Sequence, residues 1–230
     1  MDGIPSKVAL FILFIFSTTC HEAAHAWAAH RGGDDTAYAL GHVTLDPMPH
    51  IARSPWGMIA LPIFGLMYWG FPLGYASVPF DPRWGRRYPT RQALMSFAGP
   101  LANFTLAILA LLAIKGLIAG GVFHHLSTGL KVGDIYLSEG VRENSPLAAT
   151  AFVLQSLIWL NVLLGVFNLV PFPPLDGSGV VEGLSPRLLA PLYDRLREIP
   201  GYQFLGWIAA NAILDYAWGP VGALVRYAIG

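Results

Sequence analysis

Two histidines and a glutamate near the N-terminus have the spacing of a metal-dependent hydrolase. His21, Glu22 and His25 form an H-E-x-x-H motif at the end of an apolar run. Residues four apart share one face of a helix, so the two imidazoles can bind one metal ion. Glu22 then lies beside the ion, where its carboxylate can accept a proton from an attacking water molecule. Ionisable side chains in an apolar helix are costly, which favours a functional role over a polar helix end near the headgroups.

A third metal ligand is expected far downstream, because catalytic zinc usually has three protein ligands. The best candidate is Asp176, in the segment N-L-V-P-F-P-P-L-D-G at 168–177. Its three prolines stop a long apolar helix. Irregular backbone at membrane depth is tolerated where it lines a cavity, and Gly177 and Gly179 leave room for a close approach. The alternative is an ordinary helix end with Asp176 as a turn residue, which the H-E-x-x-H motif makes the weaker interpretation.

The composition of the 230 residues is that of a polytopic membrane protein. Hydrophobic residues make up 54% and charged residues 12% of the chain, whereas soluble domains carry about 25% charged residues. The net charge is zero and no basic block is present, which argues against a nucleic-acid partner. Cys20 is the single cysteine, so an intramolecular disulfide is excluded.

The elements that must position these residues are expected to be helices. Five apolar segments stand out, at 5–30, 55–73, 93–119, 147–170 and 203–229. A bilayer span takes about 20 apolar residues, and only 55–73 is doubtful, because prolines and glycines interrupt it. The predicted fold is an all-α polytopic membrane protein with about four to six transmembrane segments, a re-entrant loop and a small β element at the membrane edge. We expect a single domain over 1–230, with its core at about 8–185.

The β element is predicted from two loop segments that each end in Asp-Pro. Residues 43–47 (V-T-L-D-P) and 76–82 (A-S-V-P-F-D-P) are short extended stretches, and Asp-Pro favours a strand followed by a turn. A strand edge there could pair with an unwound segment of substrate. Ordinary connecting loops are an equal alternative. Residues 120–146 are expected to form a polar connector that is too short for a domain of its own.

The two motifs together resemble the site-2 proteases, the intramembrane zinc metalloproteases. H-E-x-x-H in the first helix and N-x-x-P-x-P-P-L-D-G at 168–177 carry the resemblance. The stretch 96–103 (S-F-A-G-P-L-A-N) is similar to that family's helix opening between the two halves of the site. The stretch 41–47 also fits, although the family more often has Arg and Asn where His42 and Asp46 stand. The resemblance covers about residues 8–185, without a PDZ-like insertion.

The resemblance implies the role of each site residue. His21, His25 and Asp176 would be the ligands of one Zn²⁺ per chain, and Glu22 would be the catalytic base. Asn168 would be a polar group that positions substrate or steadies the oxyanion. The implied activity is hydrolysis of peptide bonds in transmembrane protein substrates, within the lipid bilayer.

A membrane metal transporter or metal-sensing protein with the same ligands is the alternative function. A transporter is expected to carry further ionisable residues along its other helices. Segments 93–114 and 147–167 contain only Asn103, Gln155 and Asn161 as notable polar groups. An inactive family member that only binds substrate is a third possibility, and the intact Glu22 argues against it. The sequence leaves the oligomeric state open.

The remaining histidines are predicted to lie outside the metal site. His30 is five residues past His25 and therefore on another face of the helix. His42 and His50 lie in the loop predicted to be strand-like and are interpreted as interfacial polar residues, although they could sit near the cavity. His124 and His125 are interpreted as solvated residues of the connector.

The metal ligands also constrain the topology. His25 lies near the far end of the first helix, and Asp176 follows the far end of 147–170. Both can bind one ion only if an even number of crossings separates them. One of the three intervening segments must therefore fail to cross, and 55–73 is the obvious candidate.

If 55–73 does not cross, nine of the 14 Lys and Arg residues lie on the side of the membrane towards which the site opens. The positive-inside tendency predicts that this side is cytoplasmic. We therefore expect a multi-pass protein of the plasma membrane whose site opens towards the cytoplasmic leaflet. The nine residues are Arg31, Arg53, Arg83, Arg86, Arg87, Arg91, Arg187, Arg195 and Arg197.

Overall fold

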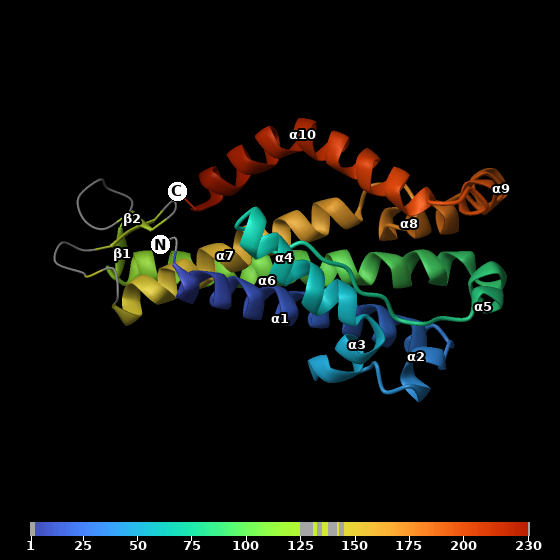
Figure 1. Cartoon of the computed structure of the whole chain (residues 1–230), viewed down its shortest axis with the longest axis horizontal. Helices are drawn as coiled ribbons and strands as arrows, with labels where there is room; N and C mark the ends of the chain where they lie inside the picture. The colour runs from blue at the N-terminus through green and yellow to red at the C-terminus, as the bar shows by residue number, and fades with distance from the viewer. Residues whose placement is uncertain (1–2, 125–130, 133–134, 138–141, 143–144, 230) are drawn as a thin grey trace.

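Three long helices form the body of the protein. The structure is a computed structural model that describes residues 3–124, 131–132, 135–137, 142 and 145–229. Helix α6 packs against both α1 and α7, and all three follow the long axis of the molecule (Figure 1). Among the described residues, these three helices are long and apolar enough to cross a membrane. Their bounds are Ile4–Arg31 for α1, Pro89–Ala119 for α6 and Pro146–Asn168 for α7.

The chain is thus a helical protein with three candidate membrane spans, where four to six were predicted. Helix α10 (Tyr202–Ile229) has 28 residues and coincides with the predicted segment 203–229. It is not among the candidate spans found in the described part of the chain. Its crossing of the membrane remains a prediction.

Helix α1 buries polar side chains together with the core residues Leu13 and Phe14, and it exposes other large apolar side chains. Ser17, Thr18 and the two histidines and glutamate of the motif are buried, whereas Ile12 and Phe16 are exposed. Helix α6 likewise exposes large apolar side chains, and its buried positions are mainly small residues. Such a distribution suits a lipid surrounding, since small residues allow close helix packing and buried polar groups serve function.

The directions of the three helices bring the two halves of the site to one end. Helices α1 and α7 run the same way and α6 runs in the opposite direction (Figure 1). Between α1 and α6 the apolar stretch forms a π-helical turn, η1 (Trp56–Ala60), followed by α4 (Leu61–Tyr68). Its 5 and 8 residues reach about 20 Å, less than the roughly 30 Å of a bilayer core. This length agrees with the expectation that this segment does not cross.

The two strands predicted at the membrane edge are wrong. Residues 43–46 form bends and a short connection, and 72–81 are extended without strand pairing. Each Asp-Pro pair begins a helix instead, α3 (Pro47–Arg53) and α5 (Pro82–Arg87). The Asp46 carboxylate accepts a hydrogen bond from the N–H of Met48 at 2.9 Å, and Asp81 accepts one from Arg83 at 2.8 Å. Asp is therefore the N-cap and Pro the first helical residue.

A small antiparallel sheet lies in the connector between α6 and α7. Its strands are β1 (Phe123–His124), β2 (Lys131–Val132) and β3 (Ile135–Leu137), in the order β1-β3-β2. His124 pairs with Tyr136 and Lys131 also faces Tyr136. His125 lies outside the described residues. The sheet is at the end of the molecule opposite α5 and α9 (Figure 1).

The segment after α7 continues to the end where α1 finishes. It contains α8 (Asp176–Leu184) and α9 (Pro186–Arg197), with the short α2 (Thr36–Ala39) at the same end. Helix α8 packs against α6. Gly179 and Gly183 permit this approach, because a Cβ at Gly179 would overlap Oγ of Ser96 and one at Gly183 would overlap the carbonyl of Pro89.

Candidate metal centre

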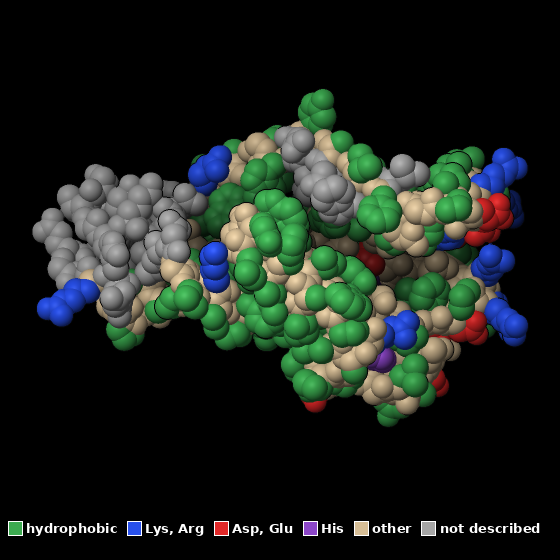
Figure 2. All heavy atoms as spheres, viewed as in Figure 1, with side chains coloured by type: hydrophobic (Ala, Val, Ile, Leu, Met, Phe, Trp, Pro, Cys, Tyr) green, Lys and Arg blue, Asp and Glu red, His purple; other side chains and the backbone are tan. Residues whose placement is uncertain are grey.

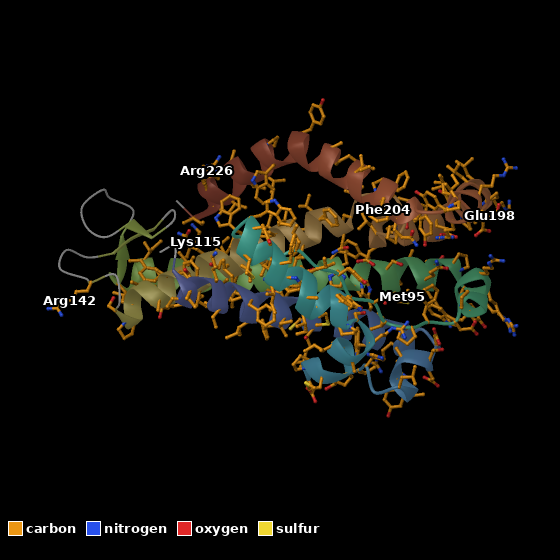
Figure 3. All side chains as sticks on the ribbon, in the orientation of Figure 1. Met95, Lys115, Arg142, Glu198, Phe204 and Arg226 are labelled. Atoms are coloured by element: carbon orange, nitrogen blue, oxygen red, sulfur yellow. The ribbon has the colours of Figure 1, made fainter. Side chains whose placement is uncertain are left out.

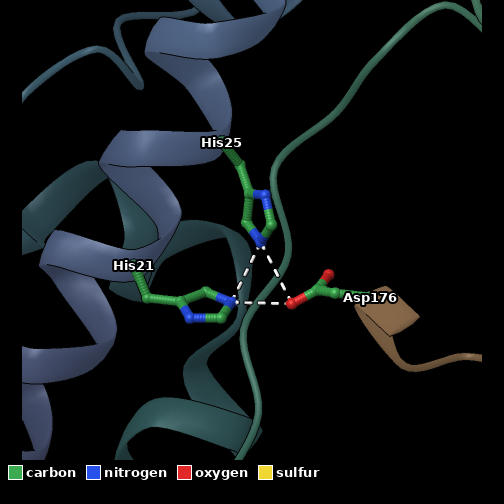
Figure 4. Close-up of side chains that lie close together, drawn as sticks. All are labelled: His21, His25 and Asp176. Atoms are coloured by element: carbon green, nitrogen blue, oxygen red, sulfur yellow. Dashed lines mark hydrogen bonds and ion pairs between the residues drawn. The ribbon is translucent and has the colours of Figure 1, made fainter. Parts of the chain in front are cut away.

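Three side chains from two distant parts of the sequence converge at the end of α1. The Nε2 atoms of His21 and His25 are 2.9 Å apart, and Oδ2 of Asp176 lies 3.0 Å and 3.2 Å from them respectively. Figure 4 shows both imidazoles reaching from α1 towards the carboxylate at the start of α8. In the part of the chain that the structure describes, this is the group of His, Cys, Asp and Glu residues that could hold a metal ion.

Each imidazole is oriented by a hydrogen bond from its other nitrogen. Nδ1 of His21 lies 2.6 Å from Oδ1 of Asn103, and Nδ1 of His25 lies 2.7 Å from the carbonyl oxygen of Met95. Both partners accept hydrogen bonds, so Nδ1 carries the proton and Nε2 carries the lone pair. This arrangement is typical of metal-bound histidines, whose outer nitrogen donates to an oxygen.

A buried polar chain fixes the amide that orients His21. The amide nitrogen of Asn161 donates to the carbonyl of Leu157 and to Oγ of Ser17, both at 2.9 Å. Its oxygen therefore faces Asn103 and accepts from Nδ2 of that residue at 2.8 Å, which leaves Oδ1 of Asn103 for His21. Asn103 and Asn161 are completely buried. The two asparagines noted in otherwise apolar segments thus support one metal-site imidazole.

The donor set fits zinc. Two imidazole lone pairs and a carboxylate oxygen point at one position, and such atoms repel one another unless a cation lies between them. Zinc bonds to nitrogen and oxygen are about 2.0–2.1 Å, so ligands in a tetrahedral site lie about 3.3 Å apart. The observed separations of 2.9–3.2 Å between Nε2 of His21, Nε2 of His25 and Oδ2 of Asp176 are close to that value.

Space for the ion is provided by Gly99 on α6. A Cβ atom at this position would overlap Nε2 of His25 and would lie 2.5 Å from Nε2 of His21. The missing side chain therefore leaves open the position that both nitrogens face. The stretch 96–103 lies in the interior of α6, not at a helix opening as the resemblance suggested.

Asp176 is presented by the proline-rich loop after α7, and this loop is held from outside. The hydroxyl of Tyr193 on α9 donates a hydrogen bond to the carbonyl oxygen of Pro171 at 2.8 Å. Arg197 of α9 pairs with Glu182 of α8 at 2.6 Å. These two contacts hold the loop and the start of α8, where Asp176 lies.

Glu22 is buried beside this group, and its Oε2 has no hydrogen-bond partner among the described residues. Electrostatic interactions connect Glu22 with His21, His25 and Asp176. A buried carboxylate oxygen without a partner is costly unless water or a ligand completes its contacts. Glu22 therefore has the position and the free acceptor that a base beside a metal ion needs.

Asn168, the fifth predicted site residue, is the last residue of α7. Its side-chain nitrogen donates to the carbonyl of Leu164 at 3.0 Å. The described contacts do not join it to the three clustered side chains, so its predicted part in the site remains a prediction. Its amide has a second N–H that this bond does not use.

The other histidines divide into two cases. His30 pairs with Asp35 at 2.6 Å and stacks on Tyr38, away from the cluster, as predicted. His42 and His50 are both buried, with ring centroids 5.2 Å apart and both Nδ1 atoms without a hydrogen-bond partner in the described part of the chain. Both rings are thus enclosed by protein, and the interpretation of the pair as interfacial residues remains a prediction.

Comparison with known proteins agrees with this centre. The family model of peptidase family M50 matches residues 9–205, which include both histidines, Glu22 and Asp176. The chain belongs to peptidase family M50, the site-2 proteases. Like other members of this family, it is an intramembrane zinc metalloprotease. Asn103, the notable polar residue of α6, is hydrogen-bonded to His21, and the transporter alternative is not favoured.

Several curated relatives of this M50 protein have names that include zinc metalloprotease. "Putative zinc metalloprotease YwhC" of Bacillus subtilis is 34% identical over 181 residues, which cover 77% of this chain and 69% of that protein. "Putative zinc metalloprotease Rip2" of Mycolicibacterium smegmatis is 30% identical over 81% of this chain and 64% of its own length. Rip2 of Mycobacterium tuberculosis is 32% identical over 74% of this chain and 54% of its own length. No solved structure matches the chain.

Proposed function

We propose that His21, His25 and Asp176 are the zinc ligands and that Glu22 is the general base of peptide hydrolysis. The observation that carries this assignment is the convergence of two Nε2 lone pairs and one carboxylate oxygen on the space beside Gly99. Zinc, when bound there, lowers the pKa of a water molecule and polarises a carbonyl group.

The chain's own residues account for the proton transfers. Glu22 accepts the proton that the attacking water loses and passes it to the amine of the departing product. Its burial next to the ligands keeps competing water away and strengthens its interaction with the developing charges. Asn168, at the end of α7, positions the substrate or steadies the oxyanion through the N–H that Leu164 does not use. A transmembrane substrate must unwind locally before its carbonyl can enter, so helix-weakening residues favour cleavage.

The experiment that tests this function compares wild type with Glu22→Gln on a single-span substrate in detergent. We expect Glu22→Gln to retain zinc and to lose cleavage by about 10²-fold or more, since general base catalysis contributes about that much. Treatment with a chelator should abolish wild-type cleavage, and added zinc should restore it. Equal cleavage by Glu22→Gln and wild type would remove Glu22 from this role.

We also propose that the site opens towards the cytoplasmic leaflet of the plasma membrane. Support comes from Lys and Arg side chains, which gather near the end that carries α5 and α9 (Figure 2). Arg142 lies at the opposite end from Glu198 (Figure 3). Single cysteines at the exposed positions Tyr38 and Tyr75, in a Cys20→Ala background, should be labelled from the cytoplasmic side. A cysteine at Arg142 should be labelled from the other side, and labelling of Tyr38 and Tyr75 from opposite sides would contradict the topology.

A further inference from the structure

Helix α9 has an apolar strip that no described part of the chain covers. Leu188 and Leu192 are 75% and 51% exposed, and their four-residue spacing places them on one face. Leu184 and Ile199, next to the two ends of α9, are exposed as well. On the other side of the helix, Tyr193 is buried against the body of the protein. Arg187 and Arg195 are exposed beside the leucines.

The position of α9 relates it to the ends of the spanning helices. The carboxylate of Asp194 lies 3.5 Å from the guanidinium of Arg86 on α5. Helix α9 also packs against α8, which begins at the metal centre. In Figure 1, α9 is seen nearly end-on, whereas α1, α6 and α7 lie along the long axis, so α9 runs across the direction of the spans.

The arginines of α5 indicate the depth at which α9 lies relative to the bilayer. Arg83, Arg86 and Arg87 lie within six residues, and all are exposed. Arginine is costly in the hydrocarbon core and stable at the headgroups. Because α9 contacts α5, it lies at the same level, parallel to the membrane plane. An amphipathic helix at that level, with leucines on one face and arginines beside them, has the features of an interfacial helix.

We propose that α9 is an interfacial helix that docks on the lipid surface around the protein. Leu188 and Leu192 enter the boundary between headgroups and acyl chains, and Arg187 and Arg195 bind the phosphates of anionic lipids. A stable protein partner would need about 800 Å² on each side, and two leucines with their flanking residues offer a much narrower strip. Lipid, in contrast, is present at this level around any membrane-embedded chain, and its negative surface complements the arginines.

The experiment places a fluorescent label on the strip and measures its depth. Full-length protein with Cys20→Ala and Leu192→Cys is labelled with a polarity-sensitive dye and reconstituted, one copy per nanodisc. The discs contain phosphatidylcholine alone or with about one third phosphatidylglycerol. Lipids brominated near the headgroup end of the acyl chains quench a dye that enters the bilayer, and aqueous iodide quenches one that does not. Glu198→Cys, exposed at the end of α9, is the matched control.

We expect the dye at 192 to be quenched by bromolipid and protected from iodide, and the dye at 198 to show the reverse. Phosphatidylglycerol should strengthen the bromolipid quenching at 192. The additional change Arg187→Gln with Arg195→Gln should remove that effect, about fivefold in partition for each arginine. Leu188→Cys serves as a second labelling position, and zinc content verifies the fold of each variant.

Two results would overturn the proposal. If iodide quenches the dyes at 192 and 198 equally, the strip faces water. If the dye at 192 is protected from iodide but is not quenched by bromolipid in single-copy discs, protein covers the strip and lipid does not.

Discussion

Nδ1 of His21 donates to Oδ1 of Asn103 at 2.6 Å, across 82 residues of sequence. This bond joins α1 to α6 and selects the nitrogen of His21 that faces the metal position. The next partner, Asn161, extends the connection to α7. One buried polar chain thus ties all three candidate spans to one proposed metal ligand.

Asn103→Ala should weaken zinc binding about 10- to 100-fold, because partners of this kind orient the ligand and raise its basicity. It also removes the donor to Asn161, which leaves a buried acceptor unpaired. The zinc affinity is measured by competition with a chelator. Thr105→Ala is the matched control, because its exposed hydroxyl bonds only to the carbonyl of Leu101 on the same helix. An unchanged affinity in Asn103→Ala would contradict the role of this bond.

Gly99→Ala should eliminate zinc binding and cleavage together, since the added methyl group would fill the space between the two imidazole nitrogens. The control is Gly116→Ala on the same helix, where a Cβ meets nothing within 4 Å. This control should keep its zinc, and in an exposed helix it should even gain up to about 1 kcal/mol in stability. Metal analysis of the two purified variants checks the prediction. Full zinc content in Gly99→Ala would place the ion elsewhere.

Tyr193→Phe should reduce zinc affinity about fivefold, since a hydrogen bond to the loop contributes about 1 kcal/mol. The change removes only the hydroxyl that donates to Pro171, and the aromatic ring still fills its buried position. The loop that carries Asp176 is then less constrained. Tyr216→Phe, at a position that is 87% exposed, is the control. A Tyr193→Phe variant that loses stability but keeps wild-type zinc affinity would show that Tyr193 acts on packing alone.

We expect the buried His42 to make the folded protein less stable in mild acid than at neutral pH. Burial, followed by the nearby His50 and Arg53, lowers the pKa of His42 below its usual 6.5. The unfolded chain then binds a proton that the folded chain does not, so this contribution to stability is present above about pH 6.5 and is lost as the pH falls through the lowered pKa. The difference in thermal midpoint between wild type and His42→Gln, measured from about pH 8 to pH 5, should therefore shift against wild type in acid. A difference that does not vary with pH would contradict the prediction.

The sequence was sufficient to predict the three candidate spans and the grouping of His21, His25 and Asp176, whose role as zinc ligands remains a proposal. The spans and the H-E-x-x-H motif depend on local patterns. H-E-x-x-H depends on helical spacing, and the spans depend on about 20 apolar residues. The predicted 5–30, 93–119 and 147–170 differ from α1, α6 and α7 by only a few residues at their ends. The meeting of His25 with Asp176 was predicted from the pairing of the two motifs, and the number of crossings followed from that meeting.

The loops could not be predicted in the same way, because one pattern has two structural outcomes. Asp-Pro can end a strand or begin a helix, and Asp46 and Asp81 both begin one. The choice depends on tertiary contacts: the N–H of Asp81 donates to the buried Asp34 at 2.8 Å, 47 residues away. The burial of His42 against His50 likewise depends on α3, in a segment that was expected to be part of a loop. Asparagine is rare in an apolar helix, so the sequence drew attention to Asn103. It did not indicate that Asn103 contacts His21.

The proposed ligands lie on the first candidate span and after the third, and this order has a consequence for biosynthesis. A nascent chain whose first hundred residues have entered the membrane contains His21, Glu22 and His25, but neither Asn161 nor Asp176. With the proposed ligand set, it has no complete zinc site while it lies among the helices of other newly made proteins. The ability to cut appears only after α7 has inserted and the proline-rich loop has brought Asp176 to the two histidines. The order of the sequence itself thus delays proteolysis until the enzyme is assembled.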